Sequence, residues 1–402
     1  MTAKGLIKVL KNTEFLKLWI GQLISNIGDE VGFLGLAALV VFKWGASPME
    51  VSMLFVFTSI PSLLFGPIAG VFVDRWKRKT TMICADLIRA LLVFLIIFSQ
   101  EIWEVYILIF LLASASRFFY PARNALIPNI VDKAVLVEAN SLSQMTFMLS
   151  LILGPAIAML IIVLVGYRTT FIIDSITFVF SAIMILMINV DERIGKYRRN
   201  PIREMIEGFS FIKKTKVVLF IILLFSFLML IFGGLNVGYP IYIRDVLKMD
   251  VVGLGGVEFA VGIGAVLGSI SVGVLSGKVK TGYITYSGII SIGILLILFA
   301  AIPVFYAVIV FAFLLGFFNM FTSVPLNALL QKKVPDDFRG KVFGTTGAMI
   351  QGASLISMGL IGLLITLLGI INVLLIAGII VTIVGFLFVF VRSTRDILNE
   401  YS

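Results

Sequence analysis

The chain has 402 residues, of which 60% are hydrophobic and 13% charged, and its formal net charge is +10. Soluble globular domains contain about twice that share of charged residues, so the composition excludes a soluble fold and indicates an integral membrane protein. One cysteine and no histidine exclude an internal disulfide and remove the usual metal ligand and the usual proton relay at neutral pH. We therefore expect no metal and no cofactor, and any proton transfer must depend on carboxylates.

Twelve apolar runs follow one another along the chain. They are long enough to cross a bilayer as helices, and too long and continuous for barrel strands. They cover residues 15–42, 50–73, 80–99, 105–126, 139–165, 168–190, 217–243, 252–276, 282–301, 303–327, 341–367 and 369–391. The first run is too long for the core of a signal peptide, so we interpret it as a retained helix. The predicted fold class is an all-α integral membrane protein with 12 transmembrane helices.

The lysines and arginines predict the orientation of these spans. When the loops are assigned alternately to the two sides, most of the cations fall on the side that holds both termini and residues 191–216. Cytoplasmic loops carry such an excess, so both termini are predicted to be cytoplasmic. The basic net charge then reflects topology, with attraction to anionic membrane lipid as a secondary effect, and no nucleic-acid partner is expected.

The polar segment 191–216 divides the chain into an N-terminal half, 1–190, and a C-terminal half, 217–402, with six predicted spans each. Inside this linker, Ile202–Ile212 has apolar residues at three- and four-residue spacing, which is typical of an amphipathic helix at a membrane surface. We favour a structural tether over a regulatory role for it.

The two halves share sequence patterns at a constant offset. Gly70–Lys79 returns in weaker form as Gly273–Thr281, and Asn124–Leu126 returns as Asn327–Leu329. Duplicated halves of this length are typical of membrane transporters, so the halves are expected to be pseudo-symmetric.

Asp29 and Glu30 lie near the middle of the first span. A charge at mid-bilayer costs about 2.5–3.5 kcal/mol, so each one retained needs a reason. Adjacent helical residues project about 100° apart, so we expect one of the two to face a wet cavity and exchange a proton. Arg117, deep in the fourth span, could instead neutralise one of them in a buried salt bridge. The sequence does not distinguish Asp29 from Glu30.

Four further charged residues lie inside predicted spans. Asp86 and Arg89 are three positions apart on one helix, so they are predicted to form a structural ion pair. Asp174 and Glu258 lie about two turns inside the membrane from the outer side. Each is a candidate for a transport role, or sits at a helix flank that water reaches.

Glycine and proline interrupt two spans. Gly154 and Pro155 lie in the fifth span, and Gly264 and Gly268 form a small-xxx-small pattern in the eighth. Such glycines let membrane helices approach closely, and a proline permits a kink. Close packing is the favoured interpretation, although helices that flex during transport need the same features.

The loop after the second span resembles a signature of the major facilitator superfamily, Gly-x-x-x-Asp-Arg-x-Gly-Arg-Arg/Lys. The matching residues are Gly70, Asp74, Arg75, Arg78 and Lys79, and Lys77 replaces the second glycine. Gly66-Pro67-x-x-Gly70 and Gly340-Lys-Val-Phe343 are similar to the macrolide-efflux branch of its multidrug exporters. The resemblance covers essentially the whole chain.

This resemblance implies a monomer in a bacterial cell membrane that works by alternating access. It also implies proton exchange, with the loop motif as a conformational latch on the cytoplasmic side. Two departures are visible. Arg117 lies about five residues nearer the cytoplasm than the arginine of proton antiporters, and Thr146 replaces a glycine of their fifth-helix pattern.

The favoured function is proton-coupled export of a hydrophobic or amphipathic small molecule. A lysophospholipid, lipid or siderophore transporter of the same fold is the alternative, and a ligand sensor on a transporter scaffold is the alternative from another class. An enzyme is not expected, because the sequence has no phosphate-binding loop, no cysteine pair and no extramembrane domain.

Overall fold

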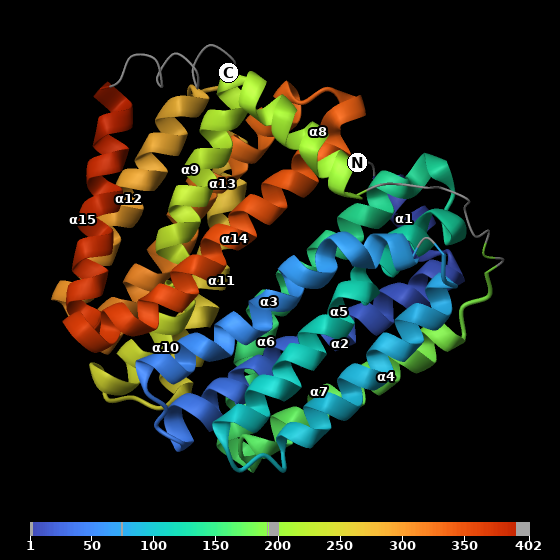
Figure 1. Cartoon of the computed structure of the whole chain (residues 1–402), viewed down its shortest axis with the longest axis horizontal. Helices are drawn as coiled ribbons and strands as arrows, with labels where there is room; N and C mark the ends of the chain where they lie inside the picture. Colours follow the sequence, from blue (N-terminus) through green and yellow to red (C-terminus); the bar gives the residue numbers. More distant parts are fainter. Residues whose placement is uncertain (1–2, 74, 191, 193–200, 391–402) are drawn as a thin grey trace. The chain divides into compact units, whose positions relative to one another are not determined.

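The computed structural model describes residues 3–73, 75–190, 192 and 201–390, and over these residues the chain is almost entirely helical (Figure 1). It divides into two compact units. The N-terminal unit comprises residues 1–45 and 53–202, and the C-terminal unit comprises residues 46–52 and 203–402. The helix over residues 48–73 thus has its first residues in the C-terminal unit and the rest in the N-terminal unit.

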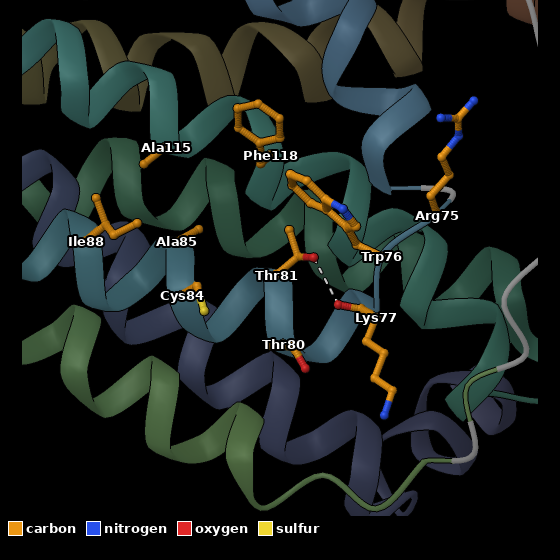
Figure 2. Close-up of a pocket in the computed structure, with 10 residues that line it drawn as sticks. All are labelled: Arg75, Trp76, Lys77, Thr80, Thr81, Cys84, Ala85, Ile88, Ala115 and Phe118. Carbon is orange, nitrogen blue, oxygen red and sulfur yellow. Dashed lines mark hydrogen bonds between the residues drawn. The ribbon is translucent and has the colours of Figure 1, made fainter.

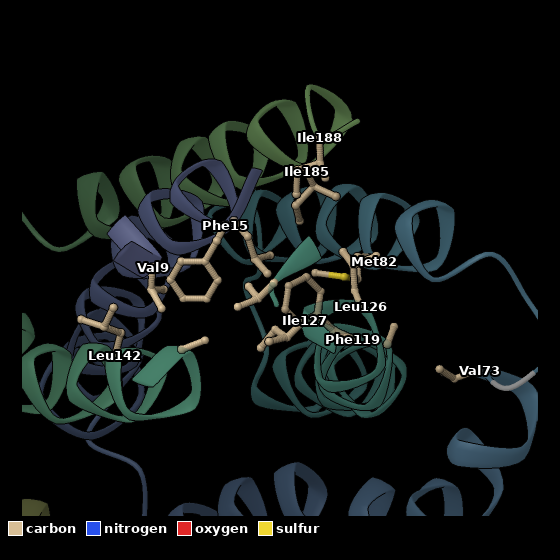
Figure 3. Close-up of a cluster of buried hydrophobic side chains, with 14 of the residues drawn as sticks. Val9, Phe15, Val73, Met82, Phe119, Leu126, Ile127, Leu142, Ile185 and Ile188 are labelled. Atoms are coloured by element: carbon tan, nitrogen blue, oxygen red, sulfur yellow. The ribbon is translucent and has the colours of Figure 1, made fainter. Parts of the chain in front are cut away.

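The N-terminal unit is a bundle built around α2 and α4. Its helices are α1 (Ala3–Leu10), α2 (Thr13–Ala37, continued by a π-helix, Ala38–Lys43), α3 (Pro48–Val73), α4 (Arg78–Ile96), α5 (Ile102–Ile130), α6 (Leu136–Val165) and α7 (Arg168–Leu186). Helix α2 packs against α6 and α7, while α4 packs against α5 and α7. A cluster of buried side chains that includes Phe15, Met82 and Phe119 joins α2, α4 and α5 (Figure 3).

The C-terminal unit holds the remaining helices. They are α8 (Pro201–Lys214), α9 (Lys216–Phe232), α10 (Leu235–Asp245), α11 (Val251–Leu275), α12 (Thr281–Ala301), α13 (Phe305–Lys333), α14 (Asp336–Leu368) and α15 (Ile370–Phe390). Helices α11 and α13 approach with almost no space between their backbones. A β-carbon added at Gly264 or Gly268 would clash with a backbone carbonyl of α13, and one at Gly316 would clash with α11. The small-xxx-small pattern of α11 is therefore a packing surface.

Among the described residues, 11 helical segments are long and apolar enough to cross a membrane. Helices α9 and α10 count as one of these, since they follow each other across Gly233 and Gly234. The predicted span over 80–99 corresponds to α4, which has 19 residues but carries the ion pair Asp86 and Arg89. Helix α4 is not among the 11 segments, so the twelfth span stays a prediction; a paired charge does cost far less in a membrane than two separate charges.

Helix α8 has two different faces. Its Gly208 lies against the backbone of Lys341 on α14, and Glu207 Oε2 accepts a hydrogen bond from Lys341 Nζ at 2.6 Å. The ring of Phe211 stacks on Phe338 at 4.9 Å between centroids. The opposite face leaves three apolar side chains exposed: Met205, Ile206 and Phe209. The first face fixes α8 to the C-terminal unit, and the second is free for the membrane surface that the sequence predicts.

Candidate functional site: a carboxylate-lined cavity in the N-terminal unit

A cavity of about 160 Å³ lies among α2, α3, α4, α5 and α7 of the N-terminal unit. Two carboxylates, Asp29 and Asp174, line it. The rest of the wall is almost wholly apolar and includes three aromatic rings, those of Phe33, Phe55 and Phe171. Ligand sites have this character, with a few polar groups set in an apolar lining.

Glycines on α2 bring Asp174 to the cavity. Gly28, Gly32 and Gly35 recur at three- and four-residue spacing, so they share one face of the helix, and this face meets α7. A β-carbon added at Gly32 would clash with the carboxylate of Asp174, and one at Gly28 would clash with Thr177. The two backbones can therefore approach closely enough for the acid of one helix to lie against the other.

Arg89 is the cation of this region. It is 2% exposed, and its Nη2 donates a hydrogen bond to Asp86 Oδ1 one helical turn away. Its guanidinium lies over the rings of Phe119 and Phe178, at 4.4 and 4.3 Å from their centroids, which is within the range of a cation–π interaction.

Arg89 also interacts electrostatically with the two acids of the cavity. Its charge acts on Asp29 and on Asp174, and the charge of Asp29 acts on Asp174 as well. Three acids, Asp29, Asp86 and Asp174, thus share the field of this guanidinium. Burying an uncompensated carboxylate is expensive, so one guanidinium beside several acids is an unusual arrangement.

The structure separates Asp29 from Glu30. Asp29 lines the cavity, whereas Glu30 lies on another face of α2, where a β-carbon at Gly154 of α6 would clash with it. Gly154 is therefore needed for close packing of α6 on α2, and Pro155 follows it inside the helix.

Arg117 does not neutralise either acid. Its Nε atom is buried and has no hydrogen-bond partner among the described residues, and the cation that acts on Asp29 is Arg89. The sequence left this salt bridge open as an alternative, because depth along a helix does not determine which face points inward. The glycine spacing of α2 was the signal that could have identified the face.

Glu258 is not brought to this cavity. It lies half-buried on α11, in the C-terminal unit.

The residues of the loop motif run from the end of α3 to the start of α4. Gly70 is in the last turns of α3, Arg75 is exposed, and Asp74 lies outside the described residues. Arg78 and Lys79 begin α4, and their backbone N–H groups donate to the carboxylate of Glu192, at 2.5 and 2.8 Å. An acid at a helix N-terminus satisfies free N–H groups and favours the helix dipole. Sequence reasoning missed Glu192, which follows α7 by only a few residues.

Comparisons with known proteins agree with this architecture. A sequence model of the Major Facilitator Superfamily matches residues 18–358. The transporter YfiS of Bacillus subtilis (strain 168), itself uncharacterised, is 27% identical over 391 residues, covering 92% of this chain and 91% of YfiS. Macrolide efflux protein A of Streptococcus pyogenes is 26% identical over 375 residues, covering 91% and 92%.

Solved transporter structures share the fold. A mutant of the nucleoside transporter NupG superposes with a TM-score of 0.76 at 15% identity, covering 94% of this chain and 99% of NupG. A bacterial homologue of the human lysosomal transporter Spinster, in an inward-facing and unoccupied conformation, gives 0.73 at 12% identity, covering 100% and 99%. At such identities the likeness concerns the fold alone.

Proposed function

Because the chain belongs to the Major Facilitator Superfamily, we propose that it exports a hydrophobic or amphipathic small molecule across the bacterial cell membrane in exchange for protons. The chain is a multi-pass membrane transporter, not an enzyme, and it has relatives among efflux proteins. What we propose is the coupling to protons and the class of substrate.

The observation that carries the proposal is the pair of acids in one apolar cavity. Asp29 and Asp174 share the wall of the cavity and the field of Arg89. A cationic or polar group of a substrate that entered the cavity would stabilise the ionised acids and so release a proton. A proton that entered would neutralise an acid and weaken the hold on the substrate. Mutual exclusion of this kind is what antiport requires.

The apolar wall supports the substrate class. Phe33, Phe55 and Phe171 offer aromatic surface beside the acids, and two relatives are named for efflux of macrolides or of multiple drugs. The cavity of about 160 Å³ is below the usual range of about 300–1,000 Å³ for a drug-sized ligand. We therefore propose that this cavity holds only one substituent of the substrate, the one that competes with the proton, and not the whole substrate.

Proteoliposomes with an imposed pH gradient test the proposal. A radiolabelled macrolide is supplied outside, the vesicle interior is made acidic, and uptake is compared with that after an ionophore dissipates the gradient. We expect uptake against the macrolide gradient only while the pH gradient persists. Uptake that ignores the gradient would contradict proton coupling. If another amphipathic drug is transported and the macrolide is not, the proposed substrate class is supported and the macrolide is excluded as a substrate.

A further inference from the structure

A second, larger cavity of about 570 Å³ opens on the N-terminal unit. It lies between the loop 75–77, the first half of α4 and the middle of α5 (Figure 2). None of its lining residues lines the cavity of Asp29 and Asp174. We refer to it as the basic-rim pocket.

The basic-rim pocket is amphipathic along its length. Arg75 and Lys77 stand at one end of it, while Ile88 and Ala115 lie at the other (Figure 2). Arg75 and Lys77 are both exposed, so an anion can reach both charged groups from outside. The pocket thus offers positive charge at its mouth and hydrocarbon along its floor.

Trp76 lies between these two ends. Its ring stacks on Phe118 of α5, with 6.0 Å between centroids and 28° between planes, and it also contacts Phe72. The side chain remains 47% exposed. Tryptophan is enriched at the level of the lipid headgroups, where its apolar ring and its N–H group both find partners.

The floor of the pocket continues into an exposed apolar stripe on α4. Cys84, Ile88, Leu91 and Leu95 recur at three- and four-residue spacing, and Leu91 is 59% exposed. In a membrane transporter, an exposed stripe of this kind contacts acyl chains. A molecule in the pocket would therefore have its tail in the bilayer and its head at the cations.

We propose that the basic-rim pocket binds one anionic phospholipid of the cytoplasmic leaflet. Its anionic headgroup lies at the end of the pocket that Arg75 and Lys77 flank, and an acyl chain runs along Ile88 beside Trp76. Charge complementarity favours this occupant, because the cations attract an anionic headgroup and most of the wall is apolar, with Thr80 and Thr81 near the cationic end. This inference does not depend on the proposed export function.

The second half of the chain provides a natural comparison. Lys278 and Lys280 occupy the positions that correspond to Arg75 and Lys77, and they line a pocket of about 610 Å³ in the C-terminal unit. Val279 stands there in place of Trp76. Lys332 lines it as well, so three cations are present. The aromatic cover is missing, so we expect this pocket to hold lipid less tightly in spite of its extra charge.

Quenching of Trp76 by lipids with brominated acyl chains tests the site. Trp19, Trp44 and Trp103 are replaced by phenylalanine, and the variant is reconstituted with brominated phosphatidylglycerol or phosphatidylcholine. The two cations of the rim together should make the preference for phosphatidylglycerol over phosphatidylcholine about thirtyfold. The control variant keeps only Trp103, which is exposed at the start of α5 and should be quenched equally by both lipids.

Neutralising the rim should remove the preference. In the Trp76 variant, Arg75→Gln/Lys77→Gln should reduce quenching by phosphatidylglycerol to the level of phosphatidylcholine, whereas Lys278→Gln/Lys280→Gln should not. Equal quenching by both lipids, or a preference that survives neutralisation, would overturn the proposal. So would relief of quenching by inorganic phosphate, which would make the site one for free phosphate, or by a macrolide, which would make it a substrate site.

Native mass spectrometry tests the same site in the chain with all its tryptophans, so its result does not depend on correct folding of the single-tryptophan variants. Wild type released from detergent should retain one phosphatidylglycerol that the Arg75→Gln/Lys77→Gln variant loses. Retention by both proteins would overturn the proposal.

Discussion

The carboxylate of Asp174 on α7 lies directly against the α-carbon of Gly32 on α2, where even a methyl group would clash with it. The acid reaches the cavity only because this position has no side chain. The geometry of the cavity therefore depends on a glycine that makes no polar contact.

Gly32→Ala should impair transport without removing any charged group. The added methyl must displace Asp174, and overpacking of this kind costs about 1–3 kcal/mol of unfolding free energy. We expect a lower thermal midpoint together with reduced gradient-driven uptake in proteoliposomes. Gly66→Ala is the matched control, since a β-carbon there meets open space. Two variants that both transport like wild type would show that the close approach is dispensable.

Asp29→Asn and Glu30→Gln should differ. Only Asp29 lines the cavity, while Glu30 packs at Gly154. We expect Asp29→Asn to abolish the proton release that accompanies substrate binding in weakly buffered detergent solution, and Glu30→Gln to retain most of it. If the two variants lose proton release equally, the cavity is not the coupling site.

Arg89→Leu should be strongly destabilising. It leaves Asp86 buried, at 0% exposure, without the cation that it pairs with, and breaking a buried pair in this way costs about 3–5 kcal/mol. The double variant Asp86→Leu/Arg89→Leu should recover much of the thermal stability. Lys8→Gln, at the exposed pair with Asp132, should cost under about 1 kcal/mol. A single variant as stable as wild type would mean that the pair does not hold α4 in place.

Glu192→Ala should loosen the start of α4. The first N–H groups of that helix would lose their acceptor, at a cost of about 0.5–2 kcal/mol. Hydrogen exchange should become faster at Arg78 and Lys79 and remain unchanged at α11, and Asp250→Ala, which removes the cap of Val252, should show the reverse. Unchanged exchange at α4 would indicate that Glu192 does not act as its cap.

Asp74→Asn should impair transport far more than a change at the corresponding position of the second half. That position is Gly277, whose φ of 82° favours glycine and tolerates asparagine, so Gly277→Asn is the suitable comparison. Equal, mild effects at matched expression would reduce the loop motif to a determinant of topology.

The helices were predictable from the sequence, and the partners of the buried charges only in part. Long apolar runs predict spans because the bilayer leaves the backbone few alternatives. Asp86 and Arg89 were predictable as a pair because three-residue spacing on one helix makes them neighbours. The presence of Asp174 in the same cavity as Asp29 was not, because it depends on which helix packs against α2. Gly28, Gly32 and Gly35 mark a face for close approach, but they do not name the helix that fills it.

The interlocked backbones of α11 and α13 limit how this transporter can evolve. At Gly264, Gly268 and Gly316, every substitution adds atoms where a carbonyl of the other helix already lies. Selection for transport of a different molecule should therefore leave these glycines unchanged. Substitutions should instead accumulate at Phe33, Phe55 and Phe171, where the wall of a cavity can change shape while the helices stay in place.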